Sequence, residues 1–226
     1  MFAFDQETAK IRIASRIARE FNEMSEARNL FVNLGVGIPT MVGDYIEGNR
    51  VFLQAENGML GVGPAAKEEN KDPRLINAGR VMVTETPGCS YFDSCSSFGM
   101  IRGGHIDASV IGAFEVDQEG NVANWIIPGG KMLGVGGAMD LISGANDVYI
   151  AMQHVSKNGS PKIIPKCTLP ITGFGRVSVV VTEYALFRFK NGQMHLEELC
   201  PQITLEELKK ITPAEFTLSK ELKIFS

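Results

Sequence analysis

The chain has 226 residues, of which 44% are hydrophobic and 21% are charged, and its formal net charge is -4. This composition supplies a full hydrophobic core, so we expect a single domain over residues 1–226. Lysine and arginine residues are scattered along the chain, which argues against nucleic-acid binding, and no apolar stretch approaches the roughly 20 residues of a membrane span.

The first residues and the cysteines indicate the compartment. Residues 1–5 show no basic flank followed by an apolar signal core. The spacing of the four cysteines, Cys89, Cys95, Cys167 and Cys200, fits neither a metal knuckle nor a dense disulfide framework. We therefore expect a cytoplasmic protein with reduced thiols and no metal site.

The first two predicted elements are a helix and a strand. Ile13, Ile17 and Phe21 recur at the spacing of one helical face, which predicts a helix over residues 6–22 with Asp5 or Thr8 at its start. Residues 30–34 form a short apolar run and predict a strand.

A glycine loop, Gly35-Val36-Gly37, ends this strand. A second helix is expected over residues 39–45, because Pro39 is tolerated in a first helical turn.

Further apolar runs predict the rest of an α/β sheet. Three runs have the composition of strands buried on both faces, which favours parallel pairing: 51–54, 108–114 and 147–152. Later segments favour antiparallel strands around a turn at 190–193: 177–182, 185–189 and 194–196. Thr204 and Glu207 fit a capped helix start, and the tail beyond it is expected to pack loosely. We expect an open, mostly parallel sheet flanked by helices, with a more antiparallel C-terminal part.

Glycines gather in five clusters, and several clusters follow predicted strands. They lie at 35/37, 58/61/63, 103/104, 129/130 and 134/136/137. In an open parallel sheet, loops at the carboxyl ends of strands meet at one edge, where glycines bring bare N–H groups to a ligand. The alternative is that each cluster is only a tight turn.

Glu56 is the main candidate for a reactive residue. It follows the apolar run 51–53 and precedes a glycine-laced loop at 58–64, so a stiff support holds the carboxylate out where little water is expected. A glutamate is ionised at neutral pH and needs no neighbouring base to act as a nucleophile. The alternative is that Glu56 closes the strand with a salt bridge.

Seven motifs occur in order within about residues 10–190: Asn33-Leu34-Gly35-Val36-Gly37-Ile38-Pro39, Gln54-Ala55-Glu56-Asn57-Gly58, Ile101-Arg102-Gly103-Gly104-His105, residues 123–128, residues 134–141, residues 166–170 and residues 181–183. Together these motifs resemble the B (beta) subunit of the family I 3-oxoacid CoA-transferases. Within that family the sequence most resembles bacterial transferases that act between butyrate or acetate and acetoacetate.

The resemblance implies an enzyme that moves coenzyme A between an acyl-CoA and a short-chain carboxylate or 3-oxoacid by a ping-pong mechanism. Glu56 stands at the position of the family nucleophile, which carries a glutamyl-CoA thioester. Coenzyme A is then a substrate, and no permanently bound cofactor is expected. The implied partner is the alpha (A) subunit of a CoA-transferase, in an α2β2 or larger hetero-oligomer.

This sequence departs from the family motif at two places. Ala55 replaces the serine before the nucleophile, and residues 128–131 read Pro-Gly-Gly-Lys where Pro-Gly-Lys is common. Neither change removes a reacting atom.

Tetrahedral intermediates of acyl transfer need hydrogen-bond donors for their oxyanion. The run 134–137 before residues 138–141 reads as a loop that opens a helix, so the N–H groups of Gly136 and Gly137 are candidate donors. The resemblance also places this segment at the active site, with Gly35, Val36 and Gly37 near it. Asn57 is a candidate to orient Glu56 or to bind a substrate carboxylate, and its alternative role is to stabilise the turn.

Other readings remain open. His105, His154 and His195 show no sign of a catalytic triad, and Arg102 is a candidate for either an anion contact or a structural salt bridge. Within the same family, a succinyl-CoA or 3-oxoadipate-type transferase is the alternative. The related fold also occurs in sugar-phosphate isomerases and in noncatalytic sugar-phosphate-binding domains.

Overall fold

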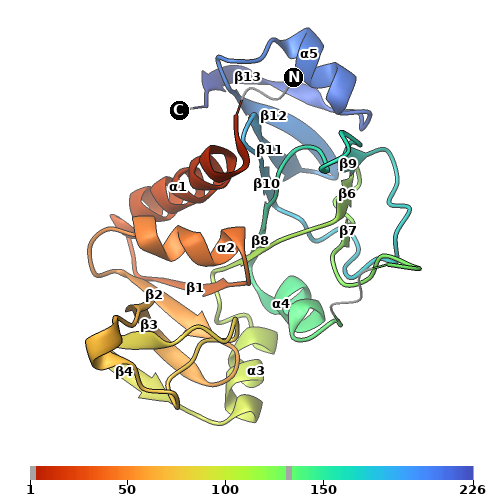
Figure 1. The fold of residues 1–226 in the computed structure, drawn as a ribbon. Helices are drawn as coiled ribbons and strands as arrows, with labels where there is room; N and C mark the ends of the chain where they lie inside the picture. Colours follow the sequence, from red (N-terminus) through yellow and green to blue (C-terminus); the bar gives the residue numbers. More distant parts are fainter. Residues whose placement is uncertain (1–3, 131–133, 226) are drawn as a thin grey trace.

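The computed structural model describes residues 4–130 and 134–225 (Figure 1). Lys131, the last residue of the Pro-Gly-Gly-Lys segment, lies outside the described residues. The helices are α1 (Gln6–Ser25), α2 (Ile38–Met41), α3 (Ser94–Arg102), α4 (Ala138–Gly144) and α5 (Leu205–Ile211), with short 3-10 helices η1 (Val42–Tyr45) and η2 (Glu68–Asn70).

The strands in chain order are β1 (Leu30–Leu34), β2 (Val51–Ala55), β3 (Met59–Ala65), β4 (Val83–Tyr91), β5 (Ala108–Ile111), β6 (Glu115–Asp117), β7 (Val122–Ala123), β8 (Asp147–Ala151), β9 (Ile163–Ile164), β10 (Val179–Val181), β11 (Ala185–Lys190), β12 (Gln193–Leu199) and β13 (Thr217–Ile224). In the described part of the chain, ten of them form one sheet in the order β13-β12-β11-β10-β8-β5-β1-β2-β3-β4. The other three form a small sheet, β7-β6-β9.

The centre of the large sheet is parallel, as the sequence predicts. Strands β10, β8, β5, β1 and β2 pair in parallel, and their residues are mostly buried. The expected antiparallel C-terminal part is also present, because β11 pairs antiparallel with both β10 and β12. Asn191 and Gly192 have φ angles of 53° and 73°, which is the backbone of the predicted two-residue hairpin turn.

Helix α1 shows how the sequence pattern becomes packing. The Asp5 carboxylate accepts hydrogen bonds from the N–H groups of Glu7 and Thr8 at 2.9 Å each, which caps the helix start. Ile13, Ile17 and Phe21 are fully buried and pack in one cluster against β1, β5, β8 and β10. Their burial fixes the helix on one face of the sheet.

Helices cover both faces of the parallel strands (Figure 1). On the first face, residues of α1, α2 and η1 share one hydrophobic cluster with the strands. On the second face, α3 and α4 contribute Ile101, Leu141 and Phe98 to a cluster that includes Phe31 of β1. The carboxyl end of β2 is therefore reached by residues of α3 and α4.

Five segments differ from the sequence prediction. The expected glycine loop at 58–64 is mostly strand β3, which pairs antiparallel with β2 and β4. The expected helix at 39–45 divides into α2 and η1, and two of the expected strands, 108–114 and 177–182, are shorter as β5 and β10. The tail expected to pack loosely forms β13 beside β12, followed by a fully buried Phe225.

Candidate functional site

Glu56 lies directly beyond β2, at the carboxyl end of the parallel strands. It stands within a tight turn, closed by a hydrogen bond from the N–H of Gly58 to the carbonyl of Ala55 at 3.0 Å. Gly58 has a φ of 126°, and a β-carbon there would lie 2.1 Å from the carbonyl oxygen of Phe92. Only glycine fits this position, so the turn that presents Glu56 depends on it.

A chain of buried amides leads to the carboxylate. Asn33 in β1 and Gln54 in β2 are register partners on adjacent strands. The Asn33 side-chain amide donates to Gln54 Oε1 at 2.6 Å and to Glu56 Oε2 at 3.1 Å. Gln54 Nε2 in turn donates to Ser97 Oγ of α3 at 2.7 Å. Asn33 and Ser97 are fully buried and Gln54 is nearly so, so these contacts are shielded from water.

Gly137 lies beside the Glu56 side chain. It is the N-cap of α4, and a β-carbon on it would lie 3.4 Å from Glu56 Cγ and 3.1 Å from the ring of Phe98. In the part of the chain that the structure describes, the N–H groups of Gly136 and Gly137 have no acceptor. The structure thus brings together the predicted nucleophile and one of the predicted donor glycines.

The first glycine loop lies at the same edge of the sheet, after β1. The N–H of Gly35 already donates to the carbonyl of Val110 at 2.8 Å, and the Gly35 carbonyl accepts from Thr40 Oγ1 at 2.7 Å. Val36 is 67% exposed, and Gly37 precedes α2 with a φ of 92°. Gly35 therefore holds the loop in place, and Val36 is the residue that the loop presents to solvent.

Asn57 points toward a different segment. Its side-chain amide donates to the carbonyl of Ile76 at 2.9 Å, which ties the turn after β2 to the loop before β4. Among the described residues, the hydrogen bond to Glu56 comes from Asn33, which sequence reasoning identified only as part of a motif. The pairing register that places Asn33 there is not visible in either strand alone.

The remaining polar candidates have structural contacts. Arg102 Nε donates to Asp140 Oδ1 at 2.7 Å and so joins α3 to α4. His154 is fully buried between Thr182 and Thr212. Within residues 4–130 and 134–225, no group of three or more His, Cys, Asp and Glu side chains is arranged to hold a metal ion. In the same residues, no helix is long and apolar enough to cross a membrane.

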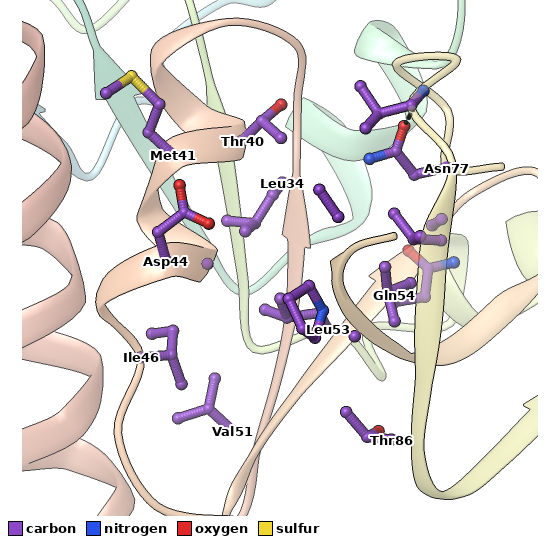
Figure 2. A pocket seen from close by; sticks show the side chains of 18 of the residues that line it. Leu34, Thr40, Met41, Asp44, Ile46, Val51, Leu53, Gln54, Asn77 and Thr86 are labelled. Carbon is purple, nitrogen blue, oxygen red and sulfur yellow. Dashed lines mark hydrogen bonds between the residues drawn. The ribbon is translucent and has the colours of Figure 1, made fainter. Parts of the chain in front are cut away.

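A cavity of about 360 Å³ lies beside the sheet, between β1–β3, η1 and the segment 77–83 (Figure 2). Its lining includes the apolar side chains of three strand residues and two polar side chains from α2 and η1: Leu34, Val51, Leu53, Thr40 and Asp44. Ala55 also lines it and is 4% exposed, whereas Glu56 does not contribute to the lining. Successive side chains of a strand point to opposite faces, so the Ala55 side chain points away from that of Gln54, although Gln54 also lines part of the cavity.

Comparison with known proteins gives a match over most of the chain. The family model described as coenzyme A transferase matches residues 13–210. The B subunit of a probable succinyl-CoA:3-ketoacid coenzyme A transferase of Bacillus subtilis is 46% identical, covering 91% of this chain and 95% of the relative. The beta subunit of the acetate CoA-transferase of Escherichia coli K12 is 46% identical, covering 95% of this chain and 96% of the relative.

Some relatives are longer single chains. The human mitochondrial succinyl-CoA:3-ketoacid coenzyme A transferase 2 is 42% identical over 96% of this chain, which spans only 42% of its length. Among solved structures, the thioester complex with CoA of the acyl-CoA transferase YdiF from Escherichia coli O157:H7 superposes with a TM-score of 0.74. It is 22% identical, covering 99% of this chain and 44% of that chain. This last likeness shows the shared fold.

Proposed function

The chain belongs to the coenzyme A transferase family, and from that premise we propose that it is the beta subunit of an enzyme that moves CoA through a thioester on Glu56. The observation that carries this proposal is the position of Glu56. A carboxylate at the carboxyl end of a parallel strand accepts a hydrogen bond from a buried amide and lies beside Gly137. This arrangement suits a nucleophile held in a fixed orientation.

The reaction proceeds in two halves. In the first, a Glu56 oxygen attacks the thioester carbonyl of the acyl-CoA and expels CoA thiolate, which leaves a mixed anhydride. The thiolate then attacks the glutamyl carbonyl and releases the first acid, so that CoA is bound to Glu56 as a thioester. The second acid reverses both steps. The thioester energy is conserved because an anhydride is at least as activated, provided that water is excluded.

Each attack on the acyl carbonyl creates an oxyanion. The N–H groups of Gly136 and Gly137 are our candidates for its donors, because they precede α4 and Gly137 is beside Glu56. Val36 and Gly37 are candidates for contact with the substrate from the first loop, whereas the Gly35 N–H is already bonded. Asn57 is a candidate for fixing the turn through Ile76.

The partner is proposed to be the alpha (A) subunit of a CoA-transferase, in an α2β2 or larger assembly. The relatives of similar length are named as B or beta subunits, which supports a separate second chain. The longer human relative supports the same division, because this chain matches less than half of it. We expect the complete activity only when both subunits are present.

The substrates are proposed to be short-chain carboxylates and 3-oxoacids, including acetate, butyrate and acetoacetate. Names of relatives support this class: one is named for acetate and another for succinyl-CoA with a 3-ketoacid. A succinyl-CoA-dependent or 3-oxoadipate-type transferase is the alternative within the family. CoA is proposed as a substrate, without a permanently bound cofactor.

Trapping the intermediate tests the proposal. The chain is copurified with a coexpressed alpha subunit, incubated with acyl-CoA, and treated with hydroxylamine or borohydride before peptide mapping. We expect modification at Glu56 only after incubation with acyl-CoA. Label on another residue, or acyl exchange without any modified protein, would contradict the mechanism. A panel of acceptor acids on the same sample ranks the substrates.

A further inference from the structure

The side chain of Asn33 contacts only one of the two carboxylate oxygens of Glu56, and the other oxygen is free to attack the substrate. Asn33 Nδ2 lies 3.1 Å from Glu56 Oε2, and among the described residues it is the donor to this carboxylate. The other oxygen, Oε1, has no hydrogen-bond donor within the described residues. The two carboxylate oxygens are therefore unequal: one is held, and the other is available to attack an acyl group.

The orientation of the Asn33 amide is fixed by its surroundings. The atom that faces Glu56 also lies 3.2 Å from the main-chain carbonyl oxygen of Gln54 and 2.6 Å from Gln54 Oε1. A main-chain carbonyl can only accept, so this end of the Asn33 amide must be its NH2 group. Gln54 keeps its oxygen toward Asn33 because its own NH2 group donates to Ser97. The amide of Asn33 therefore presents a hydrogen to Glu56.

Burial makes this arrangement costly for stability. Asn33 is fully buried, and its Oδ1 has no partner in the described part of the chain. An unsatisfied buried acceptor destabilises the folded state, whereas an aliphatic residue at this position would carry no such cost. On the other side of β1, its register partner Ser109 is equally buried and does not contact Glu56. The functional part of this side chain is therefore its NH2 group, which contacts Glu56.

Resting on the proposed function, we propose that Asn33 is a catalytic residue that donates a hydrogen bond to the oxyanion formed on Glu56 itself. When the CoA sulfur bonds to Glu56 Cδ of the mixed anhydride, the carbonyl π electrons move onto Oε2. When the intermediate collapses, the carbonyl forms again and the first acid leaves as a carboxylate with Oε1. No proton is transferred, and the reverse step uses the same donor.

The donor favours the transition state over the states that flank it. Oε2 is a neutral carbonyl oxygen in both the anhydride and the thioester, and it carries a full charge only in the tetrahedral intermediate between them. The two Asn33 hydrogens are shared among three acceptors, so the bond to Oε2 strengthens as its charge grows. Gln54 and Ser97 are positioning residues, which act through the orientation of Asn33.

The experiment isolates the glutamyl-CoA thioester and measures how fast hydroxylamine cleaves it. The complex with the alpha subunit is loaded with acyl-CoA and freed of small molecules, so that acid binding does not enter the measurement. In Asn33→Leu, we expect cleavage to slow by about 10²-fold or more, the usual effect of one oxyanion donor. The thioester carbonyl stretch should also move to higher wavenumber in the infrared difference spectrum, because hydrogen bonding lowers it.

Two further variants separate the role from a structural one. Ser109→Ala removes a buried polar group at the same register without touching Glu56, and we expect wild-type cleavage and an unshifted carbonyl. Gln54→Met leaves Asn33 in place but removes the contact that fixes its orientation. We therefore expect a smaller slowing of cleavage and a smaller shift of the carbonyl stretch than in Asn33→Leu. If Asn33→Leu does not assemble, Asn33→Ser gives the same comparison with a side chain too short to reach Glu56.

The experiment distinguishes an error in the role of Asn33 from an error in the proposed function. If the wild-type complex forms no adduct on Glu56, the proposed function is wrong. If the adduct forms, and the Asn33 variants retain wild-type cleavage and carbonyl frequency, the proposed function stands and the role of Asn33 is wrong. Equal slowing in Ser109→Ala would also overturn it, because the effect would then follow from lost packing.

Discussion

Gly137 faces the side chain of Glu56 so closely that a β-carbon on the glycine would lie 3.4 Å from Glu56 Cγ. The two residues are far apart in sequence, on the turn after β2 and on the loop that opens α4. Their contact exists because β2 and the loop before α4 meet at the same edge of the sheet. The space beside the carboxylate is kept free by the absence of a side chain.

Gly137→Ala tests the importance of this space. The φ of Gly137 is -83°, which alanine adopts without strain, so the variant should fold normally. Its methyl group would crowd the Phe98 ring at 3.1 Å and fill the space beside Glu56, and a displacement of the carboxylate by about 1 Å can reduce the rate by about 10²-fold. Steady-state kinetics of the complex should show this loss. Gly99→Ala, at an open position in α3, is the control, and wild-type turnover in both variants would contradict the expectation.

Glu56→Gln and Glu56→Ala should abolish transfer, because neither side chain supplies an anionic oxygen nucleophile. Glu56→Asp should be about 10²-fold slower or worse, since its carboxylate is one methylene further from the acyl group. Activity assays are paired with circular dichroism and size-exclusion chromatography. Near-normal turnover of a well-folded Glu56→Ala complex would remove Glu56 from the nucleophile's role.

A buried ion pair joins the first helix to a late strand. Arg16 of α1 donates to both carboxylate oxygens of Glu198 in β12, at 2.8 and 2.6 Å, and both residues are nearly buried. Glu198→Ala leaves Arg16 with one remaining carboxylate, Glu20 at 3.3 Å. We expect a loss of about 3–5 kcal/mol in the free energy of unfolding, measured by urea titration. Glu206→Ala, on the exposed side of α5, should change it by less than about 0.5 kcal/mol.

The buried His154 should make stability depend on pH. The Thr212 hydroxyl donates to the carbonyl of Leu208 at 2.7 Å, so it accepts from His154 Nε2. Nδ1 is then an acceptor for the Thr182 hydroxyl at 3.0 Å, and the ring is neutral. Burial, with a smaller effect from the charge of Lys162, lowers the pKa of His154 from 6.5 to about 3.

The sign of the pH effect follows from this lowered pKa. Below pH 6.5 His154 is protonated in the unfolded chain but stays neutral in the folded protein. The free energy of unfolding therefore falls by up to about 1.4 kcal/mol per pH unit until about pH 3. Burial raises the pKa of Glu183, which acts in the opposite direction. Urea titrations from pH 7 to pH 4 should therefore be compared with those of His154→Gln. Identical slopes for the two proteins would contradict this assignment.

Much of the fold could be predicted from the sequence because the signals were local. Helix α1 has a capping residue and an apolar stripe, the hairpin between β11 and β12 has Asn191-Gly192, and α5 has the Thr204–Glu207 capping box. Strand β3 was missed because its glycines resemble loop residues. Gly63 instead allows β3 and β4 to approach closely, because a β-carbon on it would lie 2.8 Å from the carbonyl oxygen of Thr84. Strand β13 was missed because it is an exposed edge strand with charged residues.

The site could be predicted only in part. The contact between Glu56 and Gly137 agrees with what the motifs implied, although the catalytic roles of both residues stay predictions. Asn33 could not be singled out, because its contact with Glu56 depends on the register between β1 and β2. Asn57 is adjacent to Glu56 in sequence, yet its side chain binds Ile76. At the end of a strand, two residues that are adjacent in sequence can contact different parts of the structure.

The alternation of side chains at the end of β2 has a consequence for how tolerant this segment is to mutation. A saturation scan of residues 54–56 should show that tolerance to substitution alternates along the strand. We expect substitutions of Gln54 and Glu56 to lower activity, and Ala55 to accept serine or another small residue. Exchange of Ala55 for another small residue should then leave the reactivity of the Glu56 carboxylate unchanged.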